Sequence, residues 1–177
     1  MRLYVVRHGQ TDWNAVRRLQ GKNDIPLNEE GIRQAEEARE TLKDYGFDLI
    51  FASPLKRAAL TARIINADRQ KPIFFEDRLR ERSFGTCEGM IQGTYDYTLL
   101  WNYEANESFG GECIRDFFGR VADFLDELKK CFPDKTVLIV CHGGTMRAIE
   151  CYFHGVKSPE DMAAFFSQNG EIRTYEA

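Results

Sequence analysis

The sequence predicts an α/β protein: a three-layer sandwich with a mainly parallel sheet, helices on both faces and an antiparallel strand near the C-terminus. One observation is the alternation of short apolar runs with segments whose apolar residues recur every three or four positions. A second is the run TVLIVC at 136–141, which is apolar almost throughout and β-branched at its centre. Such a run is typical of a strand buried on both faces of a parallel sheet.

Length and composition fit one globular domain over residues 1–177. Hydrophobic residues make up 43% and charged residues 29% of the chain, which are ordinary values for a soluble protein. The net charge of −4 provides no basic field to gather nucleic acid, and no stretch approaches the roughly 18 apolar residues of a membrane span. We therefore expect no nucleic acid and no membrane as partners, and the sequence makes no prediction of oligomeric state.

The cysteines and the N-terminus bear on the expected location. The apolar run at 3–6 is too short for a signal peptide. The five cysteines are odd in number and are never spaced C-x-x-C, which argues against a disulfide framework and against a structural zinc site. We expect a cytoplasmic protein that uses no metal and no cofactor.

The first half of the chain predicts two strand–helix pairs. Residues 3–6 form the first strand, and Asn28 is a plausible N-cap for a helix that ends near Gly46. Its expected buried face consists of Ile32, Ala35, Ala38, Leu42 and Tyr45. Residues 49–52 form the second strand. Ser53 and Pro54 predict a helix that starts at once, as its N-cap and first residue.

The second half continues the alternation. A short strand is expected at 72–76 and a helix at 112–131, where apolar residues return to helical spacing. The strand at 136–141 precedes a helix at 144–155. The pair Asn169-Gly170 lies between two β-leaning runs and predicts a terminal hairpin.

Two of the three histidines, His8 and His142, directly follow the two most strand-like runs. Because the carboxyl ends of parallel strands meet at one edge of a sheet, where ligands bind, we expect the two rings to lie together. Arg7 precedes His8, and Arg57 lies in the first turns of the helix after the second strand. The sequence therefore predicts a site with two histidines and two arginines on this edge.

These residue types together indicate phosphoryl transfer. Arginine holds phosphate oxygens through its planar fork, and the glycines after His142 let backbone N–H groups approach an anion. A neutral imidazole is a competent nucleophile near pH 7. A leaving alkoxide then needs a proton, and Glu81 is a candidate donor, since a bound phosphate favours the protonated form of a nearby carboxylate. Spacing alone does not distinguish Glu81 from the other 27 acidic residues.

The chain resembles the histidine phosphatase superfamily, which includes phosphoglycerate mutases and many small phosphatases. The motifs VVRHGQTDWN, LQG, PLNEEGIRQA, FASPLKRAALTA, LRERSFGTCEG, GGE and VCHGG occur in the family's order. The resemblance implies that His8 is the phosphorylated nucleophile and Glu81 the proton donor. It assigns the rest of the phosphate pocket to Arg7, Arg57 and His142, with assistance from Asn14 and the Gly143 backbone, and the substrate side to Thr11, Gln20 and Gly21.

Within that family the chain resembles the short phosphatase branch, because it lacks room for the longer insertion of the mutases. We therefore expect a metal-independent, acid-type phosphatase that acts on a small phosphorylated metabolite, with residues 86–109 covering its pocket. Cys87 departs from the pattern, since phosphatase relatives usually carry a tryptophan there. Mutase-type phosphoryl transfer is the alternative within the family.

Three readings compete with this one. Cys141 and Arg147 have the spacing of a cysteine-dependent phosphatase loop, but a buried strand cysteine is the better interpretation. Zinc hydrolysis lacks a supporting ligand spacing. A non-catalytic phosphate-binding protein would be favoured by loss of a site residue, and none is lost. His154 is interpreted as structural, and Trp13 and Trp101 as packing residues.

Overall fold

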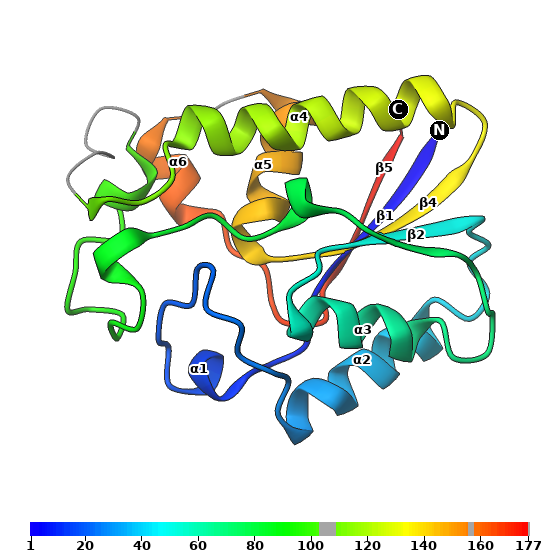
Figure 1. The fold of residues 1–177 in the computed structure, drawn as a ribbon, viewed down its shortest axis with the longest axis horizontal. Coiled ribbons are helices and arrows are strands. Elements are labelled where there is room, and N and C mark those ends of the chain that lie inside the picture. Colours follow the sequence, from blue (N-terminus) through cyan, green and yellow to red (C-terminus); the bar gives the residue numbers. More distant parts are fainter. Residues whose placement is uncertain (103–108, 156–157, 177) are drawn as a thin grey trace.

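The computed structural model describes residues 1–102, 109–155 and 158–176 (Figure 1). In this part of the chain, five strands form one sheet in the order β3-β2-β4-β1-β5. The strands are β1 (Arg2–Arg7), β2 (Leu49–Ala52), β3 (Ile73–Phe75), β4 (Thr136–Cys141) and β5 (Ile172–Glu176). The first four run parallel, and β5 pairs antiparallel with β1. The predicted fold class is confirmed.

Helices cover both faces of the sheet, as expected (Figure 1). Residues of α2 (Glu29–Thr41) and α3 (Lys56–Ile65) pack on one face, and residues of α4 (Ile114–Cys131) and α5 (Gly143–His154) pack on the other. Two short helices, α1 (Asp12–Ala15) and α6 (Pro159–Ala164), lie outside these layers, and single 3₁₀ turns occur at Asp77–Leu79, Gly85–Cys87 and Leu99–Trp101. The central strand β4 is buried along nearly its whole length.

Helix α2 confirms its predicted start and corrects its predicted face. The Asn28 side chain accepts a hydrogen bond from the Gly31 N–H, which caps the helix. Ala35, Ala38 and Leu42 are buried, but Ile32 is 38% exposed and Tyr45 is 48% exposed. Tyr45 lies beyond the last helical residue, so helical spacing no longer determines where its side chain points.

The predicted start of α3 is wrong. The helix begins at Lys56 with Leu55 as its N-cap, two residues later than a Ser53 cap would place it. The Ser53 hydroxyl instead lies 2.7 Å from His142 Nε2. The Ser53 side chain therefore contacts His142, at the end of β4, instead of capping the helix as the local pattern predicts.

The predicted terminal hairpin is also wrong. Residues 165–168 are not a strand, and the Asn169-Gly170 turn, with φ +78° at Gly170, lies between these residues and β5. The partner of β5 is β1, because the N–H of Gly170 bonds to the Arg7 carbonyl and starts that pairing. Asn169 Nδ2 donates to the His8 carbonyl at 3.0 Å. The turn thus supports the end of β1.

Candidate active site

The register of the sheet brings the two histidines together. Arg7 pairs with Cys141 across β1 and β4, so the next residue of each strand is a histidine. The His8 N–H bonds to the Cys141 carbonyl at 3.0 Å, and the His8 and His142 rings meet edge to face with 5.1 Å between their centroids. The expectation that these histidines share one edge of the sheet is confirmed.

The hydrogen bonds of His8 define its free nitrogen. Nδ1 lies 2.7 Å from the Gly9 carbonyl oxygen, and because a carbonyl only accepts, Nδ1 carries the proton and Nε2 keeps a lone pair. Burial lowers the pKa of His8 well below its usual value, and the charges of Arg57 and Arg7 lower it further. The ring is therefore neutral at pH 7 and can act as a nucleophile through Nε2.

His142 uses both ring nitrogens within the protein. Nδ1 accepts from Arg57 Nε at 3.2 Å, so Nε2 carries the proton and donates to Ser53 Oγ. Burial, followed by the charge of Arg57, lowers the pKa of His142 well below its usual value. The side chain is fully buried behind His8 and fixes the direction of Arg57.

Two histidines buried in the neutral form predict a fold that weakens in mild acid. Below about pH 6.5 the unfolded chain gains imidazole protons that the native protein, with its lowered pKa values, does not. The free energy of unfolding therefore decreases as the pH is lowered, by up to about 1.4 kcal/mol per pH unit for each histidine. Urea titrations between about pH 7 and pH 5 measure this slope.

The variant that tests this account is His8→Gln. His8→Gln should lose about half of the histidine contribution, because one of two buried imidazoles is removed. Equal slopes for wild type and His8→Gln would contradict this account.

The buried Arg57 side chain holds the loop at residues 20–23 through hydrogen bonds. Its Nη1 donates to the Asn23 carbonyl at 2.7 Å and its Nη2 to the Gly21 carbonyl at 2.9 Å. Burial lowers the pKa of Arg57 to about 10, so the group stays charged at neutral pH. Glu88 fixes the same loop, since its carboxylate accepts from the Lys22 N–H and from Asn23 Nδ2.

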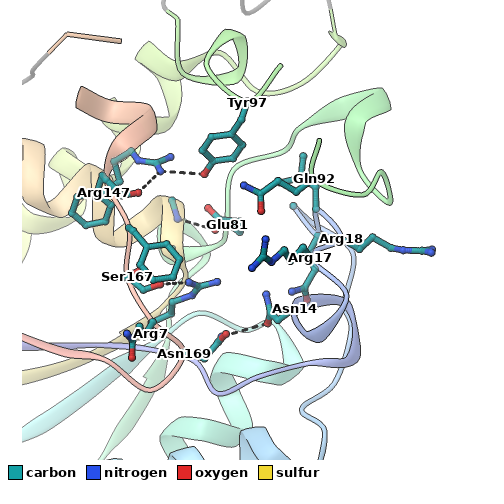
Figure 2. Close-up of a pocket in the computed structure, with 18 of the residues that line it drawn as sticks. Arg7, Asn14, Arg17, Arg18, Glu81, Gln92, Tyr97, Arg147, Ser167 and Asn169 are labelled. Atoms are coloured by element: carbon teal, nitrogen blue, oxygen red, sulfur yellow. Dashed lines mark hydrogen bonds between the residues drawn. The ribbon is translucent and has the colours of Figure 1, made fainter. Parts of the chain in front are cut away.

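Arg7 lies against the N-terminus of α5. A Cβ on Gly143 would come within 3.4 Å of Arg7 Cζ, so this guanidinium sits directly over the first residue of the helix. One of its terminal nitrogens donates to the Ser167 carbonyl, and its Nε has no hydrogen-bond partner among the described residues (Figure 2). Cationic and backbone N–H donors therefore converge where the helix dipole also favours an anion.

Glu81 reaches the same helix end from the loop after β3. Its Oε2 accepts from the Gly144 N–H at 2.9 Å, and its Oε1 accepts from the Arg82 N–H at 2.9 Å. A Cβ on Gly144 would lie 2.2 Å from Oε1, so only glycine permits this approach. This role of Gly144 is not among the predictions from the sequence, although the doubled glycine after His142 is its signal.

These residues line a cavity of about 700 Å³ (Figure 2). Eight of the ten predicted site residues belong to its wall: Arg7, His8, Asn14, Gln20, Gly21, Arg57, Glu81 and Gly143. His142 lies behind the wall, and Thr11 is buried below it, where its hydroxyl caps α1 by accepting from the Asn14 N–H. The substrate contact expected of Thr11 and the phosphate contact expected of His142 stay predictions.

Part of the segment 86–109 also reaches the cavity. Gln92, Tyr95, Tyr97 and Trp101 line it, and residues 103–108 lie outside the described residues. Trp101 is 1% exposed and packs as expected, but its ring also carries the Arg147 guanidinium at 3.6 Å. Cys87, where the family pattern has a tryptophan, is buried in the core.

Four further cavity residues come from places that sequence reasoning did not associate with the site. They are Arg17, Arg18, Arg147 and Asn169, from the loop after α1, from α5 and from the turn before β5. The sequence places Arg147 only in the C-x5-R spacing with Cys141. The spacing of the four cavity residues in the sequence does not predict that they share a cavity, because only the fold brings their three segments together.

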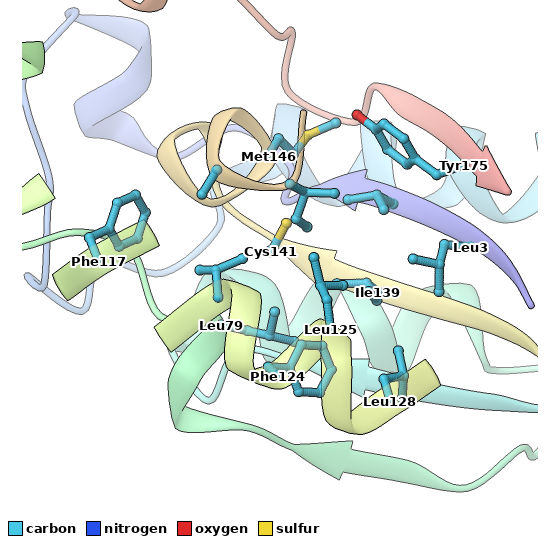
Figure 3. Packing of buried hydrophobic residues seen from close by; sticks show 14 of the residues in the cluster. Leu3, Leu79, Phe117, Phe124, Leu125, Leu128, Ile139, Cys141, Met146 and Tyr175 are labelled. Carbon is cyan, nitrogen blue, oxygen red and sulfur yellow. The ribbon is translucent and has the colours of Figure 1, made fainter. Parts of the chain in front are cut away.

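The cysteine alternative does not fit the structure. Cys141 points into the core and packs there with Leu79, Ile139 and Met146 (Figure 3). Burial raises the pKa of the Cys141 thiol, so a nucleophilic thiolate is disfavoured.

The described residues also bear on metal binding and membrane insertion. In residues 1–102, 109–155 and 158–176, no group of three or more His, Cys, Asp and Glu side chains is arranged to hold a metal ion. No helix in that part of the chain is long and apolar enough to cross a bilayer.

His154 lies exposed at the end of α5, 3.8 Å from Glu150.

Sequence comparison connects this geometry to known proteins. The chain is 42% identical over 145 residues to the uncharacterized phosphatase PhoE of Bacillus subtilis, which covers 82% of this chain and 73% of that protein. It is 35% identical to phosphoserine phosphatase 1 of Hydrogenobacter thermophilus, over 99% of this chain and 84% of that one. A 2,3-bisphosphoglycerate-dependent phosphoglycerate mutase of Cytophaga hutchinsonii is 33% identical, over 98% and 86%.

Structural comparison agrees. The solved structure of Bacillus stearothermophilus YhfR superimposes with a TM-score of 0.88 at 27% identity, covering 99% of this chain and 90% of that one. The family model described as the histidine phosphatase superfamily, branch 1, matches residues 3–177. With its paired histidines at adjacent strand ends, the chain belongs to the histidine phosphatase superfamily.

Proposed function

We propose that this protein is a phosphomonoesterase that hydrolyses a small phosphorylated metabolite through a phosphohistidine on His8. The observation that carries the proposal is the state of His8. Its ring is buried and neutral, its Nδ1 is bound to the Gly9 carbonyl, and it lines a cavity that Arg7 and Glu81 also line. That arrangement leaves a lone pair on Nε2 beside donors that suit phosphate oxygens.

In the first step, Nε2 of His8 attacks phosphorus and the ester P–O bond breaks. Arg7 and Arg57 hold the non-bridging oxygens, and the first backbone N–H groups of α5 lie on the same side. Glu81 gives its proton to the leaving oxygen, which departs as an alcohol. His142 holds Arg57 in position through Nδ1.

In the second step, water replaces the alcohol. Glu81, now a carboxylate, accepts a proton from the attacking water, the N–P bond breaks, and inorganic phosphate leaves with neutral His8 restored. Both steps balance without a metal or a cofactor. Glu81 must therefore reach the leaving oxygen in the first step and the oxygen of the attacking water in the second. Its position beside Gly144 supports both roles.

A small substrate suits the site. A cavity of about 700 Å³ is in the range of small-molecule pockets, and the relatives named above include a phosphoserine phosphatase. We propose that residues 86–109 cover the bound substrate and that Asn14, Gln20 and Gly21 contact it. The odd number of cysteines, none of them spaced C-x-x-C, supports a reducing compartment, so the cytoplasm is the proposed location.

The test is to trap the intermediate. The protein is mixed with a generic phosphomonoester, quenched without acid and digested, and the phosphorylated peptide is identified by mass spectrometry. An acid-labile, base-stable phosphate on His8 is expected. Phosphate on Cys141 would overturn the mechanism, and absence of both adduct and turnover with retained phosphate binding would favour a non-catalytic binding protein.

Phosphoglycerate separates the phosphatase from a mutase. A phosphatase releases inorganic phosphate from 3-phosphoglycerate, whereas a mutase yields the 2-phosphate isomer with little release. The mutase relative makes this comparison necessary. Isomerisation that outpaces phosphate release would show that the phosphohistidine is protected from water, and the proposed hydrolysis would be wrong.

A further inference from the structure

The cavity carries more positive charge than one phosphate requires. Within the described residues its wall holds five arginines (Arg7, Arg17, Arg18, Arg57 and Arg147) and one carboxylate, that of Glu81. The chain as a whole has a net charge of −4, so this concentration of cations is local. A phosphomonoester brings a charge of about −2. The surplus indicates a substrate with further negative charge.

Four of these arginines have defined positions that limit what they can do. Arg7 and Arg57 adjoin His8, and Arg18 lies over the Trp13 ring at 5.4 Å and extends away from the middle of the pocket (Figure 2). Arg147 is 3% exposed and donates to the Tyr97 hydroxyl and the Phe165 carbonyl. Arg17 is different, because its side chain is exposed and extends into the pocket on the wall that faces Glu81 (Figure 2).

The backbone of Arg17 is strained. Its φ is +53°, in the left-handed region that glycine occupies freely and other residues rarely adopt. The conformation is fixed from both sides, since the Arg17 N–H bonds to the Asn14 carbonyl at 3.0 Å and the Gln92 N–H bonds to the Arg17 carbonyl at 2.9 Å. Strain that the surroundings enforce at a site is a reason to look for a function of the residue that bears it.

The Arg17 guanidinium has no counter-ion among the described residues. No acidic side chain in the part of the chain that the structure describes forms an ion pair with it. Gly would satisfy the turn without strain, so the local backbone does not explain the choice of arginine. An unpaired cation that extends into a phosphate pocket is suited to bind an anionic group of the substrate.

We propose that Arg17 selects substrates that carry a second anionic group, a carboxylate or a second phosphate, beyond the phosphoryl group that is transferred. The inference rests on the proposed phosphatase function and deepens it, by naming the substrate class and the residue that recognises it. Arg17 then contributes to substrate binding, while attack and leaving-group protonation remain with His8 and Glu81.

The test compares wild type with Arg17→Gly on matched substrates. O-phosphoserine carries a carboxylate that O-phosphoethanolamine lacks. In the second pair, 3-phosphoglycerate has a carboxylate where glycerol 3-phosphate has a hydroxymethyl group. A comparison of fructose 1,6-bisphosphate with fructose 6-phosphate tests whether a second phosphate raises kcat/KM. Wild type should prefer one class of doubly anionic substrate, and Arg17→Gly should reduce that preference in kcat/KM about tenfold, mainly through KM.

Arg17→Gly also contains its own folding control. Because glycine accepts φ +53° without strain, the variant should unfold at the wild-type temperature or above it. Gln70→Gly is the matched control, since Gln70 is exposed, has φ +51° and lies outside the cavity wall. It should leave every substrate ratio unchanged. Arg17→Lys, which keeps the charge, should retain part of the preference.

Two outcomes would overturn the proposal. Equal losses by Arg17→Gly on the singly and doubly anionic partners would place Arg17 on the transferred phosphoryl group. Unchanged kcat/KM values on every substrate would make it a surface cation. Turnover of para-nitrophenyl phosphate, which has no second anionic group, tests the phosphatase function separately. If that turnover is absent, calorimetric binding of the same substrate pairs to wild type and Arg17→Gly still decides the role of Arg17.

Discussion

A His8→Ala variant is expected to bind inorganic phosphate and to hydrolyse no phosphomonoester at a useful rate. The substitution removes the His8 ring nitrogen that has a free lone pair beside Arg7 and Arg57, while both guanidinium groups stay in place. Loss of a covalent nucleophile lowers kcat by about four to six orders of magnitude. Phosphate release assays measure the rate, and calorimetry or ³¹P NMR measures phosphate binding.

The control for this prediction is His154→Ala. His154 is exposed at the end of α5, outside the cavity wall, so its variant should keep wild-type kcat and KM. Turnover by His8→Ala within tenfold of wild type would refute the phosphohistidine mechanism. Loss of phosphate binding along with turnover would instead show that the imidazole holds the anion, and the nucleophilic role would then lack support.

Glu81→Gln is expected to slow the hydrolysis of ordinary alkyl phosphates far more than that of activated esters. A poor leaving group needs a proton as the P–O bond breaks, whereas nitrophenolate leaves without one. Loss of a general acid costs about 10²- to 10⁴-fold, so kcat for an alkyl phosphate should fall by that range while first-step turnover of para-nitrophenyl phosphate is largely spared. Burst kinetics separate the two steps.

Gly144→Ala provides an independent variant with the same expectation. Its Cβ would lie 2.2 Å from Glu81 Oε1, so the carboxylate must move away from the helix end although its chemistry is unchanged. Gly143→Ala is the matched control, because its Cβ meets Arg7 at 3.4 Å and needs only a small adjustment. Equal losses on alkyl and nitrophenyl esters for Glu81→Gln and Gly144→Ala would contradict the general-acid role.

Much of the fold was predictable because its signals are local. The Asn28 cap, the helical spacing of α4 and the uninterrupted apolarity of β4 each depend on residues close in sequence. The position of the site followed from one general rule, that parallel strands end at a common edge, which places His8 beside His142. Arg7, His8 and Arg57 line the cavity for that reason, whereas Asn14, Gln20, Gly21 and Glu81 were expected there from the family resemblance.

The errors occur where a distant partner outweighs a local preference. Ser53 has the character of a helix cap, but it lies beside His142, which is remote in sequence. Asn169-Gly170 has the character of a hairpin turn, but the strand it introduces pairs with β1. In both cases the local pattern is compatible with two structures, and a contact across the sheet selects one.

The sequence by itself determined the layers, the strand ends and the residue types that suit phosphoryl transfer, since periodicity and capping are properties of short segments. Only the tertiary structure decided which nitrogen of His8 is free, how closely Glu81 approaches Gly144 and which arginines share the cavity. Tautomers, close approaches and charge clusters depend on distances between atoms from different segments. Those distances are fixed only when the packed sheet and its helices bring the segments together.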